Sequence, residues 1–587
     1  MTARLRAALL LIGSTCVSFA CVAQSTSEEE PGDDAGEIVD TGTFGSDAAR
    51  DPETAGDAGV ATDTASDTGP ACVEETIGSG PLVREGKCGK LVYGKYANRD
   101  DTRVLNVLPD FSWAGYEGGG VAIPEVPVVR TLEPATGDDR ARIQAAIDAV
   151  AALPLDAKGF RGAVLLRKGT YRVSDALRIK TSGIVLRGEG QGAGGTTLLA
   201  TAAKQYTLIE IAGSTKPLGE VSGTKTRTAA FVPVGSRSFE VKSASALAVG
   251  DRIVVRRTPN QKWIDDLKMG TYGWTPGGYT IDHERTVVAK DGNVVTVDIP
   301  IVDALDEKYG GGEVFVVHEA GRVRHAGVED LRLDSSYASE TDEAHAWNGI
   351  SLAGARDSWV RRVTALHFGY SAVSILDGSA FNTVEDTAHL DPKSQITGGR
   401  RYSFNVSGGL GNLFQRCFAR EGRHNFVTGS GTTGPNVWLD CVATDNHGDD
   451  GPHHRWSTGL LFDNTQSGAL DVQNRKDSGS GHGWAGAQTL FFNVKATSLV
   501  SDAPPGAMNW SVGATGAFRQ GNWAPEEPDG IRELTGETAK PRSLYLAQLR
   551  DRLGESAVLA VTAPAQRRGR IWTELTAWAG EGKLLLP

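Results

Sequence analysis

Histidine and arginine side chains gather in one stretch of this 587-residue chain. Five of its eleven histidines lie within a window of 59 residues: His424, His447, His453, His454 and His482. Arg423 directly precedes the first of them, and Arg455 directly follows the His453-His454 pair. Imidazole exchanges protons near neutral pH, and guanidinium pairs with carboxylates. This combination predicts proton transfer beside an anionic group.

β-Elimination at a uronic acid would use such residues. A cation must neutralise the sugar carboxylate so that the C5 proton becomes acidic. A base must then remove that proton, and an acid must protonate the leaving oxygen. The predicted cations are Arg423, Arg401 and Arg455. The predicted base is His424, and the predicted acid is His454 or Tyr402, with His453 beside them. The predicted substrate-binding residues are Arg400, Arg401, Lys476, His482, Trp484 and Trp456. In the alternative interpretation these side chains only brace the turns through hydrogen bonds and packing.

A short strand motif recurs in this region and must position these residues. Its copies begin at Asn382, Asn412 and Asn436, and each is followed by a turn and a second strand. A repeat of this length without helical periodicity is typical of a solenoid. Its coils would stack about 4.8 Å apart, the spacing of paired strands. Residues at one phase of the repeat should therefore form a ladder.

The turns of this repeat predict a cleft. The expected ladder consists of Arg400/Arg401, Arg423/His424 and His454/Arg455. The turn from Cys417 to His424 has seven residues, whereas the turns from Thr387 to Tyr402 and from Cys441 to Trp456 have fifteen each. We therefore expect two enlarged turns to form walls around a floor that contains His424. Cys417 and Cys441 are expected to stack as buried apolar side chains rather than to form a bridge or a metal site.

Carboxylates in the same segment support two other chemistries. Hydrolysis of a glycosidic bond uses a pair of acids, and the candidates are Asp445, Asp449, Asp450 and Asp463. Asp449 and Asp450 could instead bind calcium through their oxygens, and calcium is the one cofactor that the sequence suggests. The histidines lack the spacing of a zinc motif.

The segment from Gly137 to Ala200, GDDRARIQAAIDAV followed by GAVLLRKGTYRVSDALRIKTSGIVLRGEGQGAGGTTLLA, resembles a known family opening. It is similar to the start of pectate-lyase-superfamily proteins, in which a helix caps the first coils of a right-handed parallel β-helix. The stretch from His345 to Trp484 also resembles secreted bacterial members of this superfamily. The resemblance implies the fold but not the substrate, because lyases, glycoside hydrolases and phage tailspikes share this opening.

The predicted fold class is all-β: a right-handed parallel β-helix with an N-terminal capping helix, a small inserted β subdomain and a C-terminal helical tail. Ile143, Ile147 and Val150 share one face of the capping helix, and the pair Asp138-Asp139 should cap its start. A second, amphipathic helix is expected from Ser543 to Leu553, capping or flanking the last coil. The expected organisation is an export signal (1–20), an acidic disordered tether (21–75), the N-terminal cap and first coils (76–214), the inserted subdomain (215–320), the main coils with the cleft (321–512) and the tail (513–587).

Aromatic side chains are frequent in the predicted inserted subdomain. Trp263, Tyr272, Trp274 and Tyr279 lie between its predicted strands. Such residues stack on sugar faces when they are exposed, or else they form a local apolar core.

The net charge of −12 is located almost entirely in the tether. Residues 25–70 carry thirteen acids and one base, so the rest of the chain is nearly neutral. A nearly neutral body has no general basic field for nucleic acid. Residues 25–70 also lack the large apolar side chains that folding requires.

The N-terminus predicts export from a bacterial cell. Arg4 and Arg6 precede a short apolar run that ends in small residues. Cys21 is the candidate lipidation site, with simple cleavage after Ala20 or Ala23 as the alternative. The mature protein is thus expected to be secreted or held on the outer surface by a lipid, its sole membrane contact. Cys72 and Cys88 would form a disulfide outside the cytoplasm.

The favoured function is therefore that of a secreted polysaccharide lyase that cleaves a uronic-acid polymer and acts as a monomer on an acidic polysaccharide. A glycoside hydrolase that uses the aspartates is the first alternative. A non-catalytic surface adhesin or glycan-binding protein is the second, because stacked coils alone would suffice for it.

Overall fold

The computed structural model describes residues 75, 78 and 80–586. The predicted export signal, Cys21, Cys72 and the acidic segment lie outside the described residues, apart from Glu75. The expectations of lipidation and of a Cys72–Cys88 disulfide therefore stay predictions.

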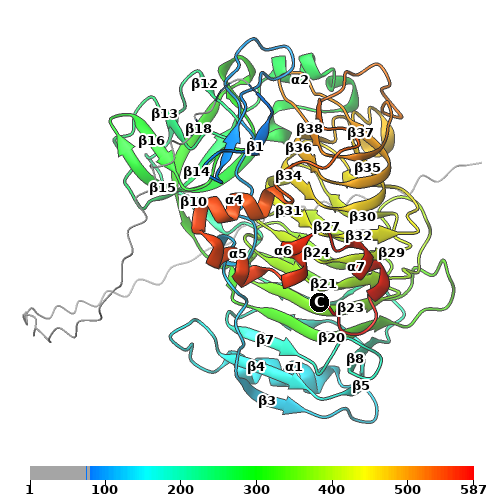
Figure 1. Cartoon of the computed structure of the whole chain (residues 1–587). Helices are drawn as coiled ribbons and strands as arrows, with labels where there is room; N and C mark the ends of the chain where they lie inside the picture. Colours follow the sequence, from blue (N-terminus) through cyan, green and yellow to red (C-terminus); the bar gives the residue numbers. More distant parts are fainter. Residues whose placement is uncertain (1–74, 76–77, 79, 587) are drawn as a thin grey trace, which may run out of the picture. The chain divides into compact units, whose positions relative to one another are not determined.

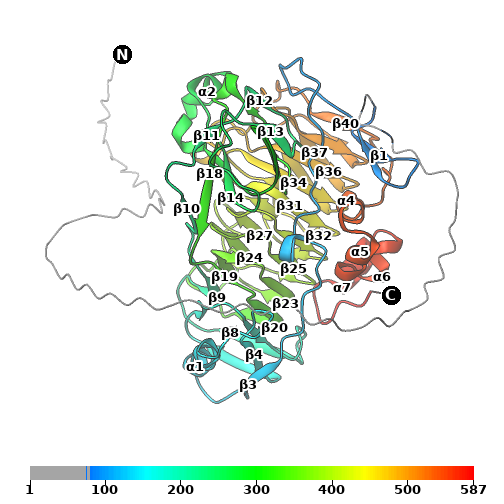
Figure 2. The ribbon, with the colours of Figure 1, turned by 90° about the vertical axis from the view of Figure 1, so that its left-hand side faces the viewer.

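The chain winds into stacked coils whose strands pair in parallel with those of the next coil (Figures 1 and 2). A typical coil has three strands, one on each face. Face A holds β4 (Gly162–Leu166), β7 (Ile184–Arg187), β20 (Gly327–Ser335), β23 (Trp359–Leu366), β25 (Thr383–Glu385), β28 (Leu413–Gln415), β31 (Thr433–Leu439), β34 (Ser457–Asp463), β36 (Gly486–Phe492), β38 (Trp510–Val512) and β40 (Ile531–Glu533). The predicted right-handed parallel β-helix is confirmed.

Two further faces complete each coil. Face B, which β20 and β23 also reach, holds β5 (Gly169–Val173), β8 (Thr196–Ala200), β26 (Ala388–Leu390), β29 (Phe418–Arg420), β32 (Val442–Thr444), β35 (Gln466–Val472), β37 (Lys495–Ser501) and β39 (Thr515–Phe518). Face C holds β6 (Leu177–Ile179), β9 (Thr207–Ala212), β21 (Asn348–Ala353), β24 (Ser371–Leu376), β27 (Tyr402–Ser407), β30 (His424–Thr428) and β33 (Asp449–Pro452).

The interior of the coils is filled by side chains stacked at equal positions. Trp438 lies parallel to Phe414 on one side and to Phe462 on the other, with ring centroids 5.6 and 4.7 Å apart. Cys417 and Cys441 are buried and unbridged, so the predicted stacking of the two thiols is confirmed. Aligned contacts of this kind bury apolar area between each coil and the next.

A buried asparagine ladder lies at the turn that enters face A. The side-chain amide of Asn412 donates to Asn436 Oδ1 at 3.0 Å, and that of Asn382 donates to Asn412 Oδ1 at 3.0 Å. Each Oδ1 also accepts the backbone N–H of the preceding ladder residue. The ladder satisfies turn groups that no strand pairing reaches.

Helix α1 (Arg140–Ala151) covers the first coils, after β3 (Val128–Leu132) has paired with β4. Ile143, Ile147 and Val150 are buried against the coil interior, as predicted. The predicted cap differs in detail. Asp139 makes no capping hydrogen bond, and Asp138 accepts instead from Arg140 N at 3.2 Å and from Ser174 Oγ at 2.6 Å. The pair thus ties the helix start to β5.

An antiparallel sheet interrupts the coils between β9 and β19 (Val323–Arg324). Its strands are β10 (Leu218–Glu220), β11 (Thr226–Arg227), β13 (Ser238–Glu240), β14 (Arg252–Arg257), β15 (Ile281–Asp291), β16 (Val294–Val297) and β18 (Gly312–Glu319), with β12 (Phe231–Val232) and β17 (Leu305–Asp306) paired beside it. We call this segment, Leu218 to Glu319 with helix α2 (Gln261–Leu267), the insert. Trp263 and Trp274 are buried against Trp456 and Trp484 of the coils, so packing, and not sugar stacking, explains these indoles.

The C-terminal tail forms four helices, α4 (Leu544–Leu553), α5 (Glu555–Val561), α6 (Pro564–Arg568) and α7 (Trp572–Trp578). Ser543 caps α4 by accepting from Leu546 N. Leu544 and Leu549 pack on the outside of face A across several coils, and not only on the last one. In the described part of the chain, no helix combines the length and apolar character needed to span a membrane.

The asparagine ladder generates a stability prediction. Asn412→Ala should lower the free energy of unfolding by about 1–3 kcal/mol for each buried group left without a partner. Circular dichroism during thermal unfolding measures the effect. The exposed Gln520→Ala is the control and should change stability by no more than about 0.5 kcal/mol. Equal melting temperatures for the two variants would show that the ladder does not stabilise the coils.

Candidate functional site

Five ring side chains from separate turns meet at the edge of face C. Tyr402 and His424 begin β27 and β30 and are register partners. His453 and His454 follow β33, and His482 lies in the long connection after β35. We call these five residues the histidine cluster.

The rings of the cluster are in contact. The ring centroids of Tyr402 and His424 are 4.9 Å apart, and those of His424 and His453 are 4.4 Å apart. His482 is 4.9 Å from His453 and 5.0 Å from His454. The structure thus brings together four of the five clustered histidines and the predicted tyrosine. The fifth, His447, lies 3.6 Å from Glu421 instead.

The tautomer of His424 follows from its surroundings. Its Nδ1 contacts the backbone carbonyl of Asp449, which can only accept, so Nδ1 carries the proton. Nε2 then carries a lone pair, and among the described residues it has no hydrogen-bond partner. A buried nitrogen without a partner is uncommon and calls for an explanation. Proton abstraction is one.

Burial keeps the cluster uncharged near neutral pH. His424 is 1 % exposed, and burial, together with Arg423 and Arg475, lowers its pKa to about 4 although Asp449 opposes the shift. Burial also lowers the pKa of His454 to about 4 and that of His482 to about 3. The pKa of His453 is lowered as well, by burial and by its histidine neighbours. All four imidazoles are therefore free bases at pH 7.

Arginines border the cluster. Arg423 Nη1 lies 3.5 Å from the hydroxyl of Tyr402 and donates to Gly398 O at 2.6 Å. Arg475 pairs with Asp449 at 3.0 Å. Arg455 donates to Ser480 Oγ at 2.8 Å. Of these, Arg475 is absent from the sequence prediction.

Several predicted substrate contacts are engaged elsewhere. Arg401 is buried and donates to Ser394 O at 2.8 Å, Arg400 pairs with Glu343, and Lys476 pairs with Glu526 at 2.7 Å. Trp456 and Trp484 are each 1 % exposed, and the Trp456 indole donates to Asp303 at 2.9 Å. Both indoles pack inside the protein, so neither presents a face to a sugar.

The predicted ladder aligns one pair of coils incorrectly, because His424 does not lie opposite His454. From the coil with β28 to the next coil, equivalent positions are 24 residues apart: Leu413 pairs with Val437, Phe418 with Val442 and Val427 with Gly451. The strand equivalent to β30 is therefore β33, and the place of His424 falls at Gly448. Arg455 instead neighbours Gly431, whose N–H donates to its carbonyl. Of the three turns compared, only the one between β26 and β27 is enlarged, because the turn after Cys441 matches the one after Cys417.

A groove beside Asp449 contains a second carboxylate. It has a volume of about 460 Å³ and is lined by Asp449, Asp471, His447 and Arg519, among others. Burial, with Asp449 adding to it, raises the pKa of Asp471 to about 7, even though Arg519 lies 2.6 Å away. Burial also opposes ionisation of Asp449, but His424 and Arg475 outweigh it, so its pKa is lowered. Asp471 is absent from the sequence prediction.

The other three candidate aspartates, Asp445, Asp450 and Asp463, do not line this groove. Asp450 is fully buried, accepts from Ser467 Oγ at 2.6 Å, and burial raises its pKa to about 7. Asp463 accepts from Ser543 Oγ at 2.6 Å at the start of α4, and Asp445 is exposed. Within the described ranges, no three His, Cys, Asp or Glu side chains are arranged to hold a metal ion. The calcium hypothesis thus gains no support from Asp449 and Asp450.

No family model and no curated protein matches the chain. Solved structures show a distant similarity to it. The ORF18 protein of Geobacillus virus E2 is 11 % identical over 69 % of this chain and 60 % of its own length, with a TM-score of 0.35. The tailspike protein gp49 of Pseudomonas phage LKA1 is 14 % identical over 68 % of this chain and 72 % of its own, with a TM-score of 0.36. The A-module of the mannuronan C-5 epimerase AlgE4 of Azotobacter vinelandii is 14 % identical over 69 % and 94 %, with a TM-score of 0.31. Similarity at this level concerns the fold alone.

The low pKa of His424 predicts a pH effect on stability. The unfolded histidine binds a proton below about pH 6.5, whereas the folded one stays neutral down to about pH 4. Between these values the unfolded state binds more protons, so stability falls as the pH falls, by roughly 3 kcal/mol for this group alone. His424→Gln should therefore lose less stability than the wild type between pH 6.5 and 4.

Thermal unfolding at a series of pH values measures this difference. The buried aspartates titrate in both proteins, so the comparison isolates His424. Gln520→Ala, at an exposed position without a titratable group, is the control and should follow the wild-type curve. Parallel curves for the wild type and His424→Gln would exclude a depressed pKa for this histidine.

Proposed function

We propose that the protein is a polysaccharide lyase that cleaves a uronic-acid polymer by β-elimination. The observation that carries the proposal is the unpartnered Nε2 of buried, neutral His424, next to Tyr402 and Arg423. These three residues supply a base, an acid and a cation within one contact distance of each other. The similarity to solved structures concerns only the coils and lends no support to this function.

Arg423, His424 and Tyr402 can together bind the sugar carboxylate and transfer every proton that the elimination requires. Arg423 binds the sugar carboxylate and makes the C5 proton acidic. His424 Nε2 takes that proton, the C5–H electron pair forms the double bond to C4, and the C4–O bond breaks. The leaving oxygen receives the Tyr402 hydroxyl proton. Burial raises the pKa of Tyr402, so this acid is protonated at the start. Transfer of a proton from His424 to Tyr402 then restores the site.

A lyase of polymers must meet its substrate outside the cytoplasm. The predicted export signal and candidate Cys21 lipidation support this location. Mass spectrometry of the mature N-terminus would distinguish a lipid-bearing Cys21 from simple cleavage.

The lyase proposal predicts a specific product. Incubation with one member of a panel of uronic-acid polysaccharides should generate an unsaturated sugar, which absorbs ultraviolet light. Tyr402→Phe and His424→Ala should each lower the rate about 10²–10⁴-fold with the fold retained by circular dichroism. Cys441→Ala is the control, because it should lower stability but leave the activity of each folded molecule unchanged. Full activity of Tyr402→Phe would refute the assigned acid.

Hydrolysis is a second candidate, and the groove beside the cluster favours it. Asp449 and Asp471 line the same groove, and their pKa values are shifted in opposite directions. Two carboxyl groups whose pKa values are shifted apart can divide the roles of general base and general acid. The groove is also open to solvent, which would let water reach the reacting bond.

The two candidates differ in product and in sensitivity to mutation. A hydrolase should release reducing ends without ultraviolet absorbance, and Asp471→Asn should lower that release about 10²–10⁴-fold. Tyr402→Phe should then have little effect. Release of reducing ends that survives Asp471→Asn would eliminate this pair. Binding of a polysaccharide without any product would indicate the adhesin alternative.

A further inference from the structure

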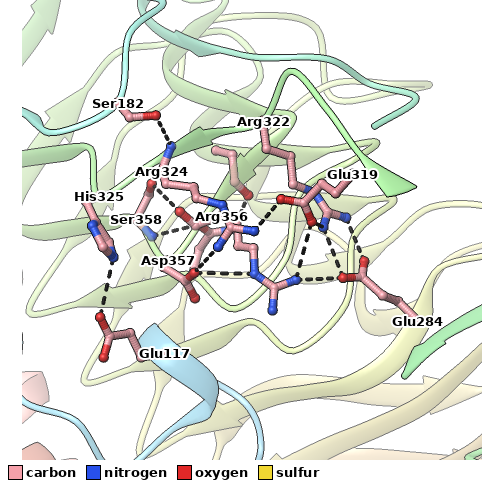
Figure 3. A network of polar contacts seen from close by, with 12 residues as sticks. Glu117, Ser182, Glu284, Glu319, Arg322, Arg324, His325, Arg356, Asp357 and Ser358 are labelled. Carbon is pink, nitrogen blue, oxygen red and sulfur yellow. Dashed lines mark hydrogen bonds and ion pairs between the residues drawn. The ribbon is translucent and has the colours of Figure 1, made fainter. Parts of the chain in front are cut away.

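The insert is fixed to the coils by a buried network of ion pairs (Figure 3). Glu284 of β15 bonds Arg322 at 2.8 Å and Arg356 at 2.7 Å, and Glu319 at the end of β18 bonds Arg322 at 2.5 Å. Burial opposes ionisation of Glu284, but the arginines outweigh it and lower its pKa to about 2. Polar networks whose members are satisfied rigidify their surroundings. The insert and the coil turns therefore hold a fixed relation.

A cavity of about 530 Å³ lies beside this network. One wall comes from the insert and its lead-in, with Lys216, Arg256, Thr280 and Asp282. The floor comes from three successive turns between faces C and A, namely Gly378, Gly408-Gly409 and Gly431. Its volume falls within the range of ligand pockets, roughly 300–1,000 Å³.

The floor is backbone, and it must be glycine at two positions. Gly408 has φ +101°, and a Cβ there would lie 2.0 Å from Asp377 Oδ1. Gly378 has φ +75°, and its Cβ would lie 2.5 Å from Ser214 O. These two glycines let the turns pack closely on Asp377 and Ser214, whereas nothing lies within 4 Å of the Cβ position of Gly431, so a ligand can approach the backbone directly there. The turns repeat at about the coil spacing of 4.8 Å, which suits an extended chain.

Two ionic groups in this cavity lie close enough to influence each other: burial raises the pKa of Asp377, and Lys216 opposes that shift. The side chains of Lys216 and Asp377 are exposed, and within the described part of the chain neither makes a hydrogen bond or an ion pair. Next to them Arg256 and Asp282 form a two-bond pair, at 2.7 and 2.8 Å, that leaves both partly exposed. The cavity thus contains both donors and acceptors, and sugar hydroxyls can pair with both kinds.

The cavity adjoins the edge of the histidine cluster. Gly431, in its floor, donates its N–H to Arg455 O at 2.9 Å. Tyr279 directly precedes Thr280 of the wall and stacks on Trp274 with ring centroids 4.1 Å apart. The floor of the cavity therefore contacts Arg455, which directly follows His454 of the cluster.

We propose that the insert, its lead-in and the coil turns beside them form a second glycan subsite, which holds a stretch of polysaccharide away from the bond that is cleaved. Lys216 would pair with a sugar carboxylate, and Asp377 would accept from sugar hydroxyls. The preference for long polysaccharide chains, and not the chemistry of bond cleavage, would then depend on this subsite. The proposal rests on a polysaccharide being the substrate, but not on how its bond is broken.

Binding measurements on the full protein test the subsite without turnover. An array of acidic and neutral polysaccharides first identifies the strongest binder, and titration calorimetry then compares its octasaccharide with its disaccharide. Lys216→Ala and Asp377→Asn should each weaken octasaccharide binding about tenfold, because a charge-assisted hydrogen bond is lost. Disaccharide binding should be unchanged. Lys242→Ala, on an exposed lysine of the insert that does not line the cavity, is the matched control.

The outcomes separate this inference from the proposed reaction. Loss of octasaccharide affinity in the two variants supports the subsite even if no product forms, in which case the lyase alone fails. Octasaccharide affinity equal to that of the Lys242→Ala control overturns the subsite even if the enzyme is a lyase. Failure of the wild type to bind any polysaccharide of the array overturns both.

Discussion

The register between neighbouring coils is the constraint on which the site depends. Tyr402, His424 and Asp449 begin three strands of face C, and they meet only because each strand pairs in parallel with the one before it. The asparagine ladder and the stacked interior rings fix that register, since a slip of one residue would exchange inward and outward side chains. The stacked coils therefore fix where the side chains of the candidate site lie, and the turns between the strands carry those side chains. Stability and function reside in different parts of each repeat, so residues at the corner can change without loss of the stack.

The histidine cluster contains buried nitrogen atoms without hydrogen bonds, which lowers stability. This cost favours a functional role for the cluster. Nε2 of His424 and Nδ1 of His453, His454 and His482 are buried without a hydrogen-bond partner among the described residues. Each such group costs free energy that a bracing residue would normally recover through a hydrogen bond. Bracing alone therefore does not explain the cluster. The arginines nearby do find partners, as Arg401 and Arg475 show. The unsatisfied groups include Nε2 of His424, a proton acceptor of the kind that a proton-transfer site requires.

The sequence predicted the fold well, because the Gly137–Ala200 opening and the recurring Asn motif both report coil geometry. It also identified most of the cluster from residue type alone. It failed where two coils had to be aligned: Arg423-His424 was matched to His454-Arg455 by composition, whereas the 24-residue spacing from Asn412 to Asn436, carried forward, leads from His424 to Gly448. Trp456 and Trp484 were misplaced for another reason. They are covered by Trp263 and Trp274 of the insert, and no local pattern predicts contacts between segments so distant in sequence.

In the proposed reaction, the position of Arg423 next to His424 would make the base respond to its substrate. In the free protein the guanidinium helps burial to lower the pKa of the imidazole, so His424 is neutral but weakly basic. A sugar carboxylate bound to Arg423 would cancel that positive charge and add a negative one near Nε2, which raises the pKa of the imidazole. His424 would thus become a stronger base only when the anionic substrate is in place. Interactions that strengthen towards the transition state, and not those present in the free enzyme, are the ones that accelerate a reaction. A buried neutral histidine beside an arginine fits that requirement better than an exposed, partly protonated one.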